Sequence, residues 1–284
     1  MRRPFFRFEV FVMVKKRYPG GKARAFNISY DDGIEQDIRF VQLLNQYGIK
    51  GTFNLNSGLM KQEFQWVHEC GIPIRRLPES VVKELYRGHE VACHTYSHPY
   101  MDDYSEADIL RELAADRFFL EKLFGREVTG YATPFYYYSD LTVKCVKECG
   151  FEYARISEMS NEYSVPEDFF RWRGSKFHWD DDLEAFVDAF MHCEDELALC
   201  QLVGHSYDLD VYNMWERIER IVKAVSNAED VWSATHIELV RYLKAMEKVE
   251  ITLEYIYNNS DTDLWFDIDG DVITVCAGEK EELK

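Results

Sequence analysis

Strand-like and helix-like segments alternate along most of this chain, and that alternation limits the possible folds more than any other feature of the sequence. The segment 24–30 is short and rich in apolar and aromatic residues, as strands are, whereas 34–47 carries apolar residues three or four positions apart, as helices do. Seven or eight such units follow one another within about 240 residues. Repeated strand–helix units predict a parallel sheet covered by helices.

The individual elements can be located from periodicity, from capping residues and from the glycines that end several helical segments. The expected strands cover 24–30, 50–56, 89–94, 128–133, 151–156, 171–177 and 196–205, with a shorter one at 231–235. The expected helices cover 34–47, 79–87, 105–124, 140–149, 181–192, 213–227 and 236–247. Ser105 with Asp108 resembles a capping box at the start of the third helix, and Gly125 ends it.

So many parallel units favour a closed barrel over an open sheet. We therefore expect residues 1–247 to form one α/β domain, an irregular (β/α) barrel of seven or eight units that begins with a strand in the first 21 residues. After Met246 the pattern changes to strand-like segments separated by the turn sequences NNSD and DIDGD. Residues 248–284 are expected to form a small C-terminal β appendage with strands at 251–259, 263–268 and 271–277.

Composition narrows the class of partner. The net charge of −18 would repel nucleic acid and anionic membranes, so a neutral or cationic substrate fits best. No segment approaches the ~20 apolar residues that span a bilayer, and Arg7 and Glu9 interrupt the only stretch that resembles a signal peptide. Seven cysteines without a C-x-x-C pair indicate neither a disulfide framework nor a zinc ribbon. A cytoplasmic protein is expected, and its oligomeric state is left open.

Polar side chains gather where the expected strands end. In a barrel of this kind function lies at the carboxyl ends of the strands, so these residues should share one rim. They are Asp31, Asp32, Asn54, Asn56, His94, His98, Thr133, Pro134, Arg155, His178 and His205. One polar strand end means little, but this many at one rim are hard to explain by packing.

The segment CHTYSHP places His94 and His98 four residues apart. A helix is disfavoured because Gly88 precedes a strand-like stretch and Pro99 restricts His98. At the end of a strand, two imidazoles from one turn can bind a divalent ion if a third ligand comes from elsewhere. Alone, the pair could equally be structural; the acidic pair on a neighbouring strand end favours the metal.

The sequence SYDDG raises a similar choice, because Asp-Asp-Gly is also a common turn. At a strand end the side chains of Asp31 and Asp32 diverge, so one can bind a metal while the other acts as a general base. His205, in LVGHSYD, ends the most apolar strand. It is either a core histidine or a general acid on the opposite side of the site.

Taken together, SYDDG, HTYSH, the proline segment YATPFYYYSD and LVGH resemble, in this order, the motifs of the polysaccharide deacetylase family (NodB homology, carbohydrate esterase family four) over about residues 20–245. The longer run around SYDDG resembles a divergent, non-secreted bacterial subgroup. The resemblance implies a distorted (β/α)7 barrel holding a divalent metal, usually zinc. It implies that Asp31 is the base, that Asp32, His94 and His98 hold the metal, and that His205 is the acid. Pro134, Phe135 and Tyr136 match the segment that helps to bind the oxyanion.

Two motifs depart from the family pattern. The family has an arginine just before the proline of its third motif, where this chain has Ala132 and Thr133. Arg155 is the expected replacement, with Arg171 and Arg173 as weaker candidates. The Asp–Trp pair of the fourth motif has no clear counterpart, and the segment 178–180 is the nearest.

The resulting hypothesis is metal-assisted removal of an acetyl group from an N-acetylated saccharide or another small amide. Zinc is the expected ion, with cobalt, manganese or nickel as alternatives. Asn54, Asn56, Arg155 and His178 are expected near the substrate, and Trp179 and the tyrosines at 136–138 could stack on sugar rings or belong to the core. O-acetyl ester or cyclic amide hydrolysis, non-haem iron oxygenation and saccharide binding without catalysis remain alternatives.

Overall fold

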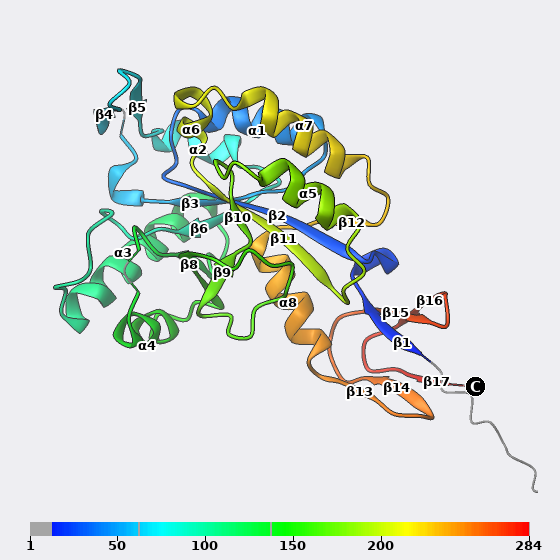
Figure 1. Ribbon diagram of the computed structural model, residues 1–284. Coiled ribbons are helices and arrows are strands. Elements are labelled where there is room, and N and C mark those ends of the chain that lie inside the picture. The colour runs from blue at the N-terminus through cyan, green and yellow to red at the C-terminus, as the bar shows by residue number, and fades with distance from the viewer. Residues whose placement is uncertain (1–12, 62, 137, 284) are drawn as a thin grey trace, which may run out of the picture.

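The computed structural model describes residues 13–61, 63–136 and 138–283 and shows a parallel sheet curled into a barrel (Figure 1). The strand order is β10-β11-β2-β3-β6-β7-β8-β9, with β12 on the amino-terminal half of β2. The strands are β2 (Arg24–Asp31), β3 (Thr52–Leu55), β6 (Glu90–Cys93), β7 (Gly130–Ala132), β8 (Tyr153–Met159), β9 (Trp172–Gly174), β10 (Lys176–Phe177), β11 (Ala198–Gly204) and β12 (Val231–Ser233). All pairs within this sheet are parallel, as the sequence predicts.

The segment 171–177 connects the two edges of the sheet and so closes the barrel. The chain at 171–177, expected as one strand, forms β9 against β8 and then β10 against β11. Ser175, between the two halves, donates its backbone N–H to the carbonyl of Gln201 on β11 (2.9 Å). The first and last strands of the sheet are therefore consecutive in the chain, and their connection leaves only a short gap in the ring.

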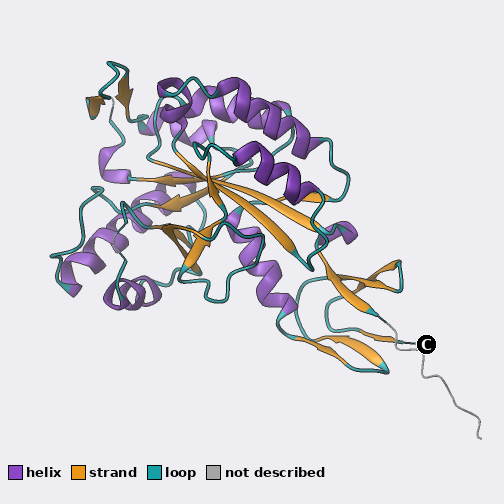
Figure 2. Ribbon diagram, in the orientation of Figure 1, coloured by secondary structure: helices purple, strands orange, loops and turns teal. Residues whose placement is uncertain are grey.

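Helices surround the barrel on the outside (Figure 2). They are α1 (Asp37–Gln46), α2 (Glu79–Leu85), α3 (Glu106–Phe124), α4 (Asp140–Glu148), α5 (Leu183–Met191), α6 (Ser206–Val211), α7 (Trp215–Ser226) and α8 (His236–Met246). Ser105 caps α3 by accepting from the backbone N–H of Asp108, and Gly125 ends it with φ 68°, both as predicted. None of the helices within the described part of the chain is long and apolar enough to cross a membrane.

Two apolar cores hold the domain together. The larger lies between the helices and the barrel, and it contains residues such as Phe40 on α1 and Leu113 on α3. The smaller joins the amino-terminal ends of the strands to α8 and to the C-terminal strands, through residues such as Trp172, Leu243 and Phe266. The barrel and the appendage therefore share buried surface.

The tail forms two small sheets, one of which includes the start of the chain. The strands β1 (Val14–Arg17), β15 (Leu264–Ile268) and β16 (Asp271–Val275) form one antiparallel sheet, and β13 (Val249–Ile251), β14 (Tyr255–Asn258) and β17 (Lys280–Glu282) form the other. Of the predicted opening strand, the structure confirms Val14–Arg17, and residues 1–12 lie outside the described residues. The appendage lies at the far end of the molecule from the hairpin of β4 and β5 (Figure 1).

Several elements differ from the sequence prediction. The hairpin of β4 (Gln65–Val67) and β5 (Pro73–Arg75) and the short helix α6 were not expected. The expected strand 251–259 is interrupted between β13 and β14, and α1 begins at Asp37 rather than at residue 34. Two 3-10 turns, Pro19–Gly21 and Ser57–Leu59, complete the described elements. Each difference falls on a short or irregular segment, where periodicity carries little information. All seven cysteines are free thiols in the structure.

Replacing Trp172 by alanine should destabilise the barrel. The indole is 2% exposed, so its removal leaves a cavity worth about 3–5 kcal/mol of unfolding free energy. Urea denaturation of the variant measures this loss. Leu253→Ala is the control, because Leu253 is 79% exposed and its truncation should change stability by less than about 0.5 kcal/mol. Equal stabilities of the two variants would contradict the assigned packing.

Candidate active site

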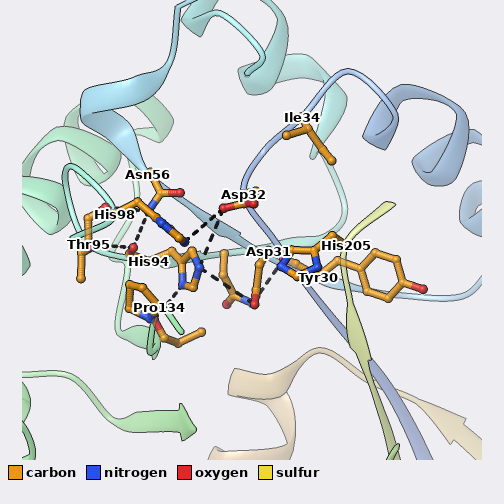
Figure 3. Close-up of polar contacts among 12 residues, drawn as sticks. Tyr30, Asp31, Asp32, Ile34, Asn56, His94, Thr95, His98, Pro134 and His205 are labelled. Atoms are coloured by element: carbon orange, nitrogen blue, oxygen red, sulfur yellow. Dashed lines mark hydrogen bonds and ion pairs between the residues drawn. The ribbon is translucent and has the colours of Figure 1, made fainter. Parts of the chain in front are cut away.

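Three predicted metal ligands meet at the carboxyl ends of β2 and β6, two strands of the sheet that are separated by β3. Asp32 follows β2, and His94 and His98 lie in the turn after β6 (Figure 3). Asp32 Oδ1 lies 3.5 Å from Nε2 of His98 and 4.0 Å from Nε2 of His94. All three offer a ligand atom within 4.8 Å of the others. As predicted, the segment holding the two histidines is a strand end and not a helix.

These donors fit a divalent ion. Ligands at about 2.0–2.1 Å from a tetrahedral zinc lie roughly 3.3–3.5 Å apart, close to the observed separations. Nδ1 of His94 donates to the carbonyl of Ala132 (2.9 Å), which leaves Nε2 with a free lone pair facing Asp32. Asp32 Oδ1 is buried and faces Nε2 of both imidazoles; Nη1 of Arg76, 2.7 Å away, is its partner in an ion pair. A carboxylate oxygen that faces two imidazole nitrogens is the donor set that a divalent cation needs.

The backbone at the site is bent to produce this convergence. Four of the eight non-glycine residues with positive φ in the described chain line the site: Asp32 (88°), Thr95 (68°), His98 (56°) and Phe135 (54°). Gly33 follows Asp32 with φ 64°, and a Cβ there would lie 2.8 Å from a methyl carbon of Leu55. The Asp-Asp-Gly sequence therefore makes a tight turn in which the two carboxylates diverge. Strained conformations of this kind cluster at functional sites.

Asp31 is held by two polar side chains. Nη2 of Arg155 lies 2.6 Å from both carboxylate oxygens, and Nδ2 of Asn54 donates to Oδ1 at 2.7 Å. Burial acts to raise the pKa of Asp31, but Arg155, then His94 and His205, outweigh it, so that the pKa lies below its usual value. Asp31 is thus a buried carboxylate that stays ionised. The structure brings Arg155 to this position, whereas Arg171 pairs with Asp140 on the surface.

Arg76 holds the second carboxylate, and the sequence analysis missed it. Its Nη1 lies 2.7 Å from Asp32 Oδ1 and 2.8 Å from Oδ1 of Asn56. It also donates to the backbone carbonyl of Asp32. Burial raises the pKa of Asp32, but Arg76, with smaller contributions from His98, His205 and His94, lowers it well below the usual range. Arg76 follows the β4–β5 hairpin, a polar segment without periodicity, so no local signal marked it.

His205 lies across the cavity from the metal ligands and is oriented by Asp208. Its Nδ1 donates to Oδ2 of Asp208 (3.1 Å), so that Nε2 is free to face the cavity. Burial lowers the pKa of His205, but the hydrogen bond to Asp208 and the charges of Asp32 and Asp31 raise it to about 9. The imidazole is therefore protonated near neutral pH. Asp208 lies on the unexpected helix α6, and the sequence analysis did not single it out.

Three of the predicted substrate residues lie behind the cavity instead. His178 is 1% exposed; its Nε2 donates to Asp208 (3.1 Å) and its Nδ1 accepts from the hydroxyl of Tyr30. Asn54 and Asn56 are buried too, the first bonded to Asp31 and the second to Arg76 and to backbone carbonyls of the His94 turn. None of the three lines the cavity, because their side chains are turned to buried polar partners: Asp31 for Asn54, Arg76 for Asn56 and Asp208 for His178.

A cavity of about 380 Å³ opens over the assembled residues. Asp31, Asp32, His94, His98, Arg155 and His205 line it together with Phe135, Tyr136 and several other aromatic residues. The predicted oxyanion segment is therefore at the cavity, with Pro134 buried beneath it and Tyr136 exposed. Tyr138 packs against the core, Trp179 lines the cavity, and residue 137 lies outside the described residues. The enclosed, aromatic shape suits a small polar ligand.

Residues 19–154 match the family model for polysaccharide deacetylases. The chain is also 27% identical over 127 residues to a peptidoglycan-N-acetylglucosamine deacetylase of Bacillus cereus, an alignment that covers 44% of this chain and 53% of that protein. Residues 19–154, just under half of the chain, thus carry the homology of the polysaccharide deacetylase family. The chain spans about half the length of this curated relative. Residues 19–154 contain the strand ends that carry Asp31, Asp32, His94 and His98.

Solved structures confirm the fold of this chain. A structure from Mycobacterium smegmatis assigned to the polysaccharide deacetylases is similar over 84% of this chain and 96% of its own, with a TM-score of 0.60 and 17% identity. A family-four acetyl xylan esterase from Clostridium thermocellum, bound to a cobalt ion, is similar over 78% and 91%, with a TM-score of 0.51 and 14% identity. A family-four pseudoenzyme variant with restored activity is similar over 80% and 70%, with a TM-score of 0.52 and 15% identity.

Replacing Arg76 by methionine should destabilise the protein strongly. Methionine keeps much of the apolar bulk but leaves Asp32 as a buried charge without its arginine, which costs about 3–5 kcal/mol. Arg75→Met is the matched control, because Arg75 is exposed and pairs with Glu35 only at 3.6 Å, an interaction worth less than about 1 kcal/mol. Urea unfolding of the two metal-free variants measures the difference. Arg76→Met as stable as Arg75→Met would show that the pair with Asp32 is not structural.

Proposed function

We propose that the protein is a metal-dependent hydrolase that removes the acetyl group from an N-acetylated carbohydrate. Homology to the family supports deacetylase chemistry on carbohydrate amides in general. The observation that carries the specific proposal is the meeting of Asp32, His94 and His98 with Asp31 and His205 at one cavity. A metal triad, an ionised carboxylate and a protonated imidazole are the groups that this hydrolysis requires.

Asp32, His94 and His98 would hold the ion. A divalent cation there supplies Lewis-acid chemistry: it polarises a carbonyl group and makes water a better nucleophile at neutral pH. Zinc suits one carboxylate with two imidazoles, and cobalt, manganese or nickel could replace it. The solved acetyl xylan esterase that holds cobalt in the same fold supports a metal in this kind of barrel.

Asp31 is proposed as the general base. It lies beside the triad, with Oδ2 4.0 Å from Nε2 of His94, but is bound to Arg155 and Asn54. Its carboxylate is ionised at neutral pH and can take the proton of an attacking water. Arg155 and Asn54 would act as positioning residues, because they hold the carboxylate of Asp31 in place and take no part in the proton transfer themselves.

His205 is proposed as the general acid that protonates the leaving amine. The carboxylate of Asp208 accepts a hydrogen bond from Nδ1–H of His205, so the proton on Nε2 is the one that faces the cavity. Phe135 and Tyr136 form another part of the cavity wall, and their backbone N–H groups are the proposed donors to the oxyanion. Pro134 has no N–H and would act only by fixing the path of the backbone before them.

The alternatives fit the site less well. An iron oxygenase needs two histidines and one carboxylate with open positions, and it gives no role to Asp31 or to the raised pKa of His205. A protein that only binds saccharides would not need the ion pair between Arg155 and Asp31. In this proposal Arg155 replaces the arginine that the family has in its third motif. O-acetyl ester hydrolysis uses the same groups and is the second candidate, supported by the acetyl xylan esterase of the same fold.

Acetate release from N-acetylated and O-acetylated saccharides, with zinc, cobalt, manganese or nickel supplied in turn, tests the proposal. We expect release from an N-acetylated saccharide that stops when a chelator removes the metal and returns when it is restored. Full activity in a chelator-treated, metal-free protein would refute the metal mechanism. Oxygen consumption in place of acetate release would identify an oxygenase.

Replacing Asp31 by asparagine should separate catalysis from metal binding. The variant keeps Asp32, His94 and His98, so it should bind one zinc per chain while kcat falls by about 10²–10⁴-fold with the loss of the base. Metal analysis and acetate release give the two readouts. In Asp32→Asn, by contrast, the zinc content itself should fall. Loss of zinc in Asp31→Asn would mean that base and ligand are exchanged.

Replacing Asp208 by asparagine should move the alkaline limb of the pH profile. His205 acts while protonated, so activity is present below its folded-state pKa of about 9 and is lost as pH rises through it. A divalent cation nearby would lower that limb. Removing the carboxylate lowers the pKa of His205 further, so kcat/KM of Asp208→Asn should begin to fall at a lower pH than in the unmodified protein. Asp210→Asn is the control, because Asp210 instead accepts from the indole of Trp215. An unshifted limb would exclude Asp208 from tuning the acid.

A further inference from the structure

The turn that carries both histidine ligands is bonded to helix α3 through two carboxylates of that helix. Glu112 and Asp116 are four residues apart, so their side chains leave the same face of α3 one turn apart. Neither residue lines the active-site cavity, and neither has a role in the mechanism above. The turn runs from His94 to His98, so its two ends carry two of the three proposed metal ligands.

Asp116 binds the first end of the turn. It is fully buried, and its Oδ2 accepts from the backbone N–H of His94 (3.0 Å), which also donates to the carbonyl of Leu55 (2.9 Å). Its Oδ1 accepts from the backbone N–H (2.8 Å) and the hydroxyl (2.5 Å) of Ser57. His94 follows β6 and Ser57 lies shortly after β3, so one buried side chain ties the ends of these two strands to each other.

Asn56, which precedes Ser57, extends this connection towards the third ligand. Its Nδ2 donates to the carbonyl of His94, beside which it lies (Figure 3), and its Oδ1 accepts from Nη1 of Arg76 (2.8 Å). Arg76 in turn pairs with Asp32. The hydrogen bonds that begin at α3 therefore reach ligands from both strands.

Glu112 binds the second end of the turn. Its Oε2 accepts from the backbone N–H of Ser97 (2.8 Å), and its Oε1 accepts from the hydroxyl of the same residue (2.8 Å). Ser97 directly precedes His98. Both oxygens of Glu112 are thus given to the residue beside a metal ligand.

The turn needs such support because its backbone is strained. Thr95 has φ 68° and His98 has φ 56°, left-handed values that residues with a Cβ adopt at a cost. The bonds from α3 fall on His94 and Ser97, one residue before each strained position. They hold the turn in the form in which the two imidazole rings, with centroids 5.0 Å apart, both reach Asp32. Without them the separation of the two ligand nitrogens is no longer fixed.

We propose that Glu112 and Asp116 are positioning residues of the metal site, which fix both ends of the ligand turn and so set the separation of His94 and His98. We call these two carboxylates the α3 clamp. The inference rests on the proposed function, because it takes the two histidines as metal ligands. Residues behind the ligands strengthen metal binding by holding the ligands in the geometry of the bound state.

Zinc affinity tests the α3 clamp in two isosteric variants. In Asp116→Asn the NH2 group that replaces one oxygen faces a backbone N–H, so the zinc Kd should rise by about 10–100-fold. In Glu112→Gln one of the two bonds to Ser97 is lost at a half-buried position, so the Kd should rise by about threefold to tenfold. Titration of zinc into each metal-free protein, in competition with a chelating indicator, measures both values.

Glu106→Gln is the matched control. Glu106 is another half-buried glutamate of α3, but it pairs with Lys144 on α4 (2.7 Å), and within the described residues its side chain makes no hydrogen bond to the ligand turn. The zinc Kd of this variant should equal that of the unmodified protein. Visible absorption of the cobalt-loaded proteins is a second readout, because it reports the geometry of the ligands. We expect altered bands in the two clamp variants and unaltered bands in Glu106→Gln.

Urea unfolding of the metal-free proteins separates positioning from general stability. Clamp variants that fold and bind zinc and cobalt as the unmodified protein does would overturn the proposal, even if they unfolded at lower urea concentrations. If Asp116→Asn does not fold, Glu112→Gln decides the question, because its side chain is only half-buried.

The α3 clamp is judged by metal binding and the proposed function by acetate release, so the two can fail separately. If the unmodified protein binds zinc but releases no acetate, deacetylation falls, and weaker zinc binding in the clamp variants still supports the clamp. If acetate is released and both variants bind zinc with unchanged affinity, the proposed function stands and the clamp falls.

Discussion

The site depends on two successive carboxylates that are buried and yet ionised. Asp31 and Asp32 are each 6% exposed, and burial alone would drive both towards the neutral form. Two arginines prevent this: Arg155 lies 2.6 Å from Asp31, and Arg76 lies 2.7 Å from Asp32. Each carboxylate has its own cation, so neither has to share a proton with the other. The rest of the architecture brings these four side chains together.

The two arginines reach the site by different routes. Arg155 lies on β8, which is separated by three strands from β2, the strand that ends at Asp31, and it reaches across because the sheet is curled into a barrel. Arg76 follows the β4–β5 hairpin. The next residue, Leu77, donates its backbone N–H to the carbonyl of Gly33 and so holds this segment beside the Asp-Asp-Gly turn. A cation in the triad would add positive charge on the side of Asp32, while Arg155 remains with Asp31. This arrangement keeps the proposed base apart from the proposed ligand although they are neighbours in the chain.

On the opposite wall of the cavity a carboxylate stabilises a charged imidazole, just as the arginines stabilise the two charged carboxylates. His205 is half-buried among aromatic rings, which would favour a neutral imidazole, but Asp208, three residues on, accepts a hydrogen bond from its Nδ1–H. His178 and Tyr30 extend this chain of hydrogen bonds into the barrel interior and hold the carboxylate in place. His178 thus supports the site from behind the cavity wall.

Local sequence determined the features that depend on a few neighbouring residues. Strand–helix alternation predicted the barrel, Ser105 and Gly125 predicted the ends of α3, and Asp-Asp-Gly and the two histidines before Pro99 predicted the turns that carry the ligands. Capping bonds, backbone conformation and periodic burial act over about one turn of chain, so they can be read without a fold. Arg155 was found because it ends up on a strand that periodicity had located.

Only the tertiary structure decided which distant side chains complete the site. Arg76 lies in a polar segment without periodicity, and Asp208 lies on a helix of six residues. His178 directly follows the two-residue strand β10, whose pairing with β11 depends on the break at Ser175. Which polar groups meet in a barrel is set by ring closure and by the path of the loops. Ring closure and loop paths bring together residues that are far apart in the chain. The local sequence around each of these residues does not show which distant residue it will contact.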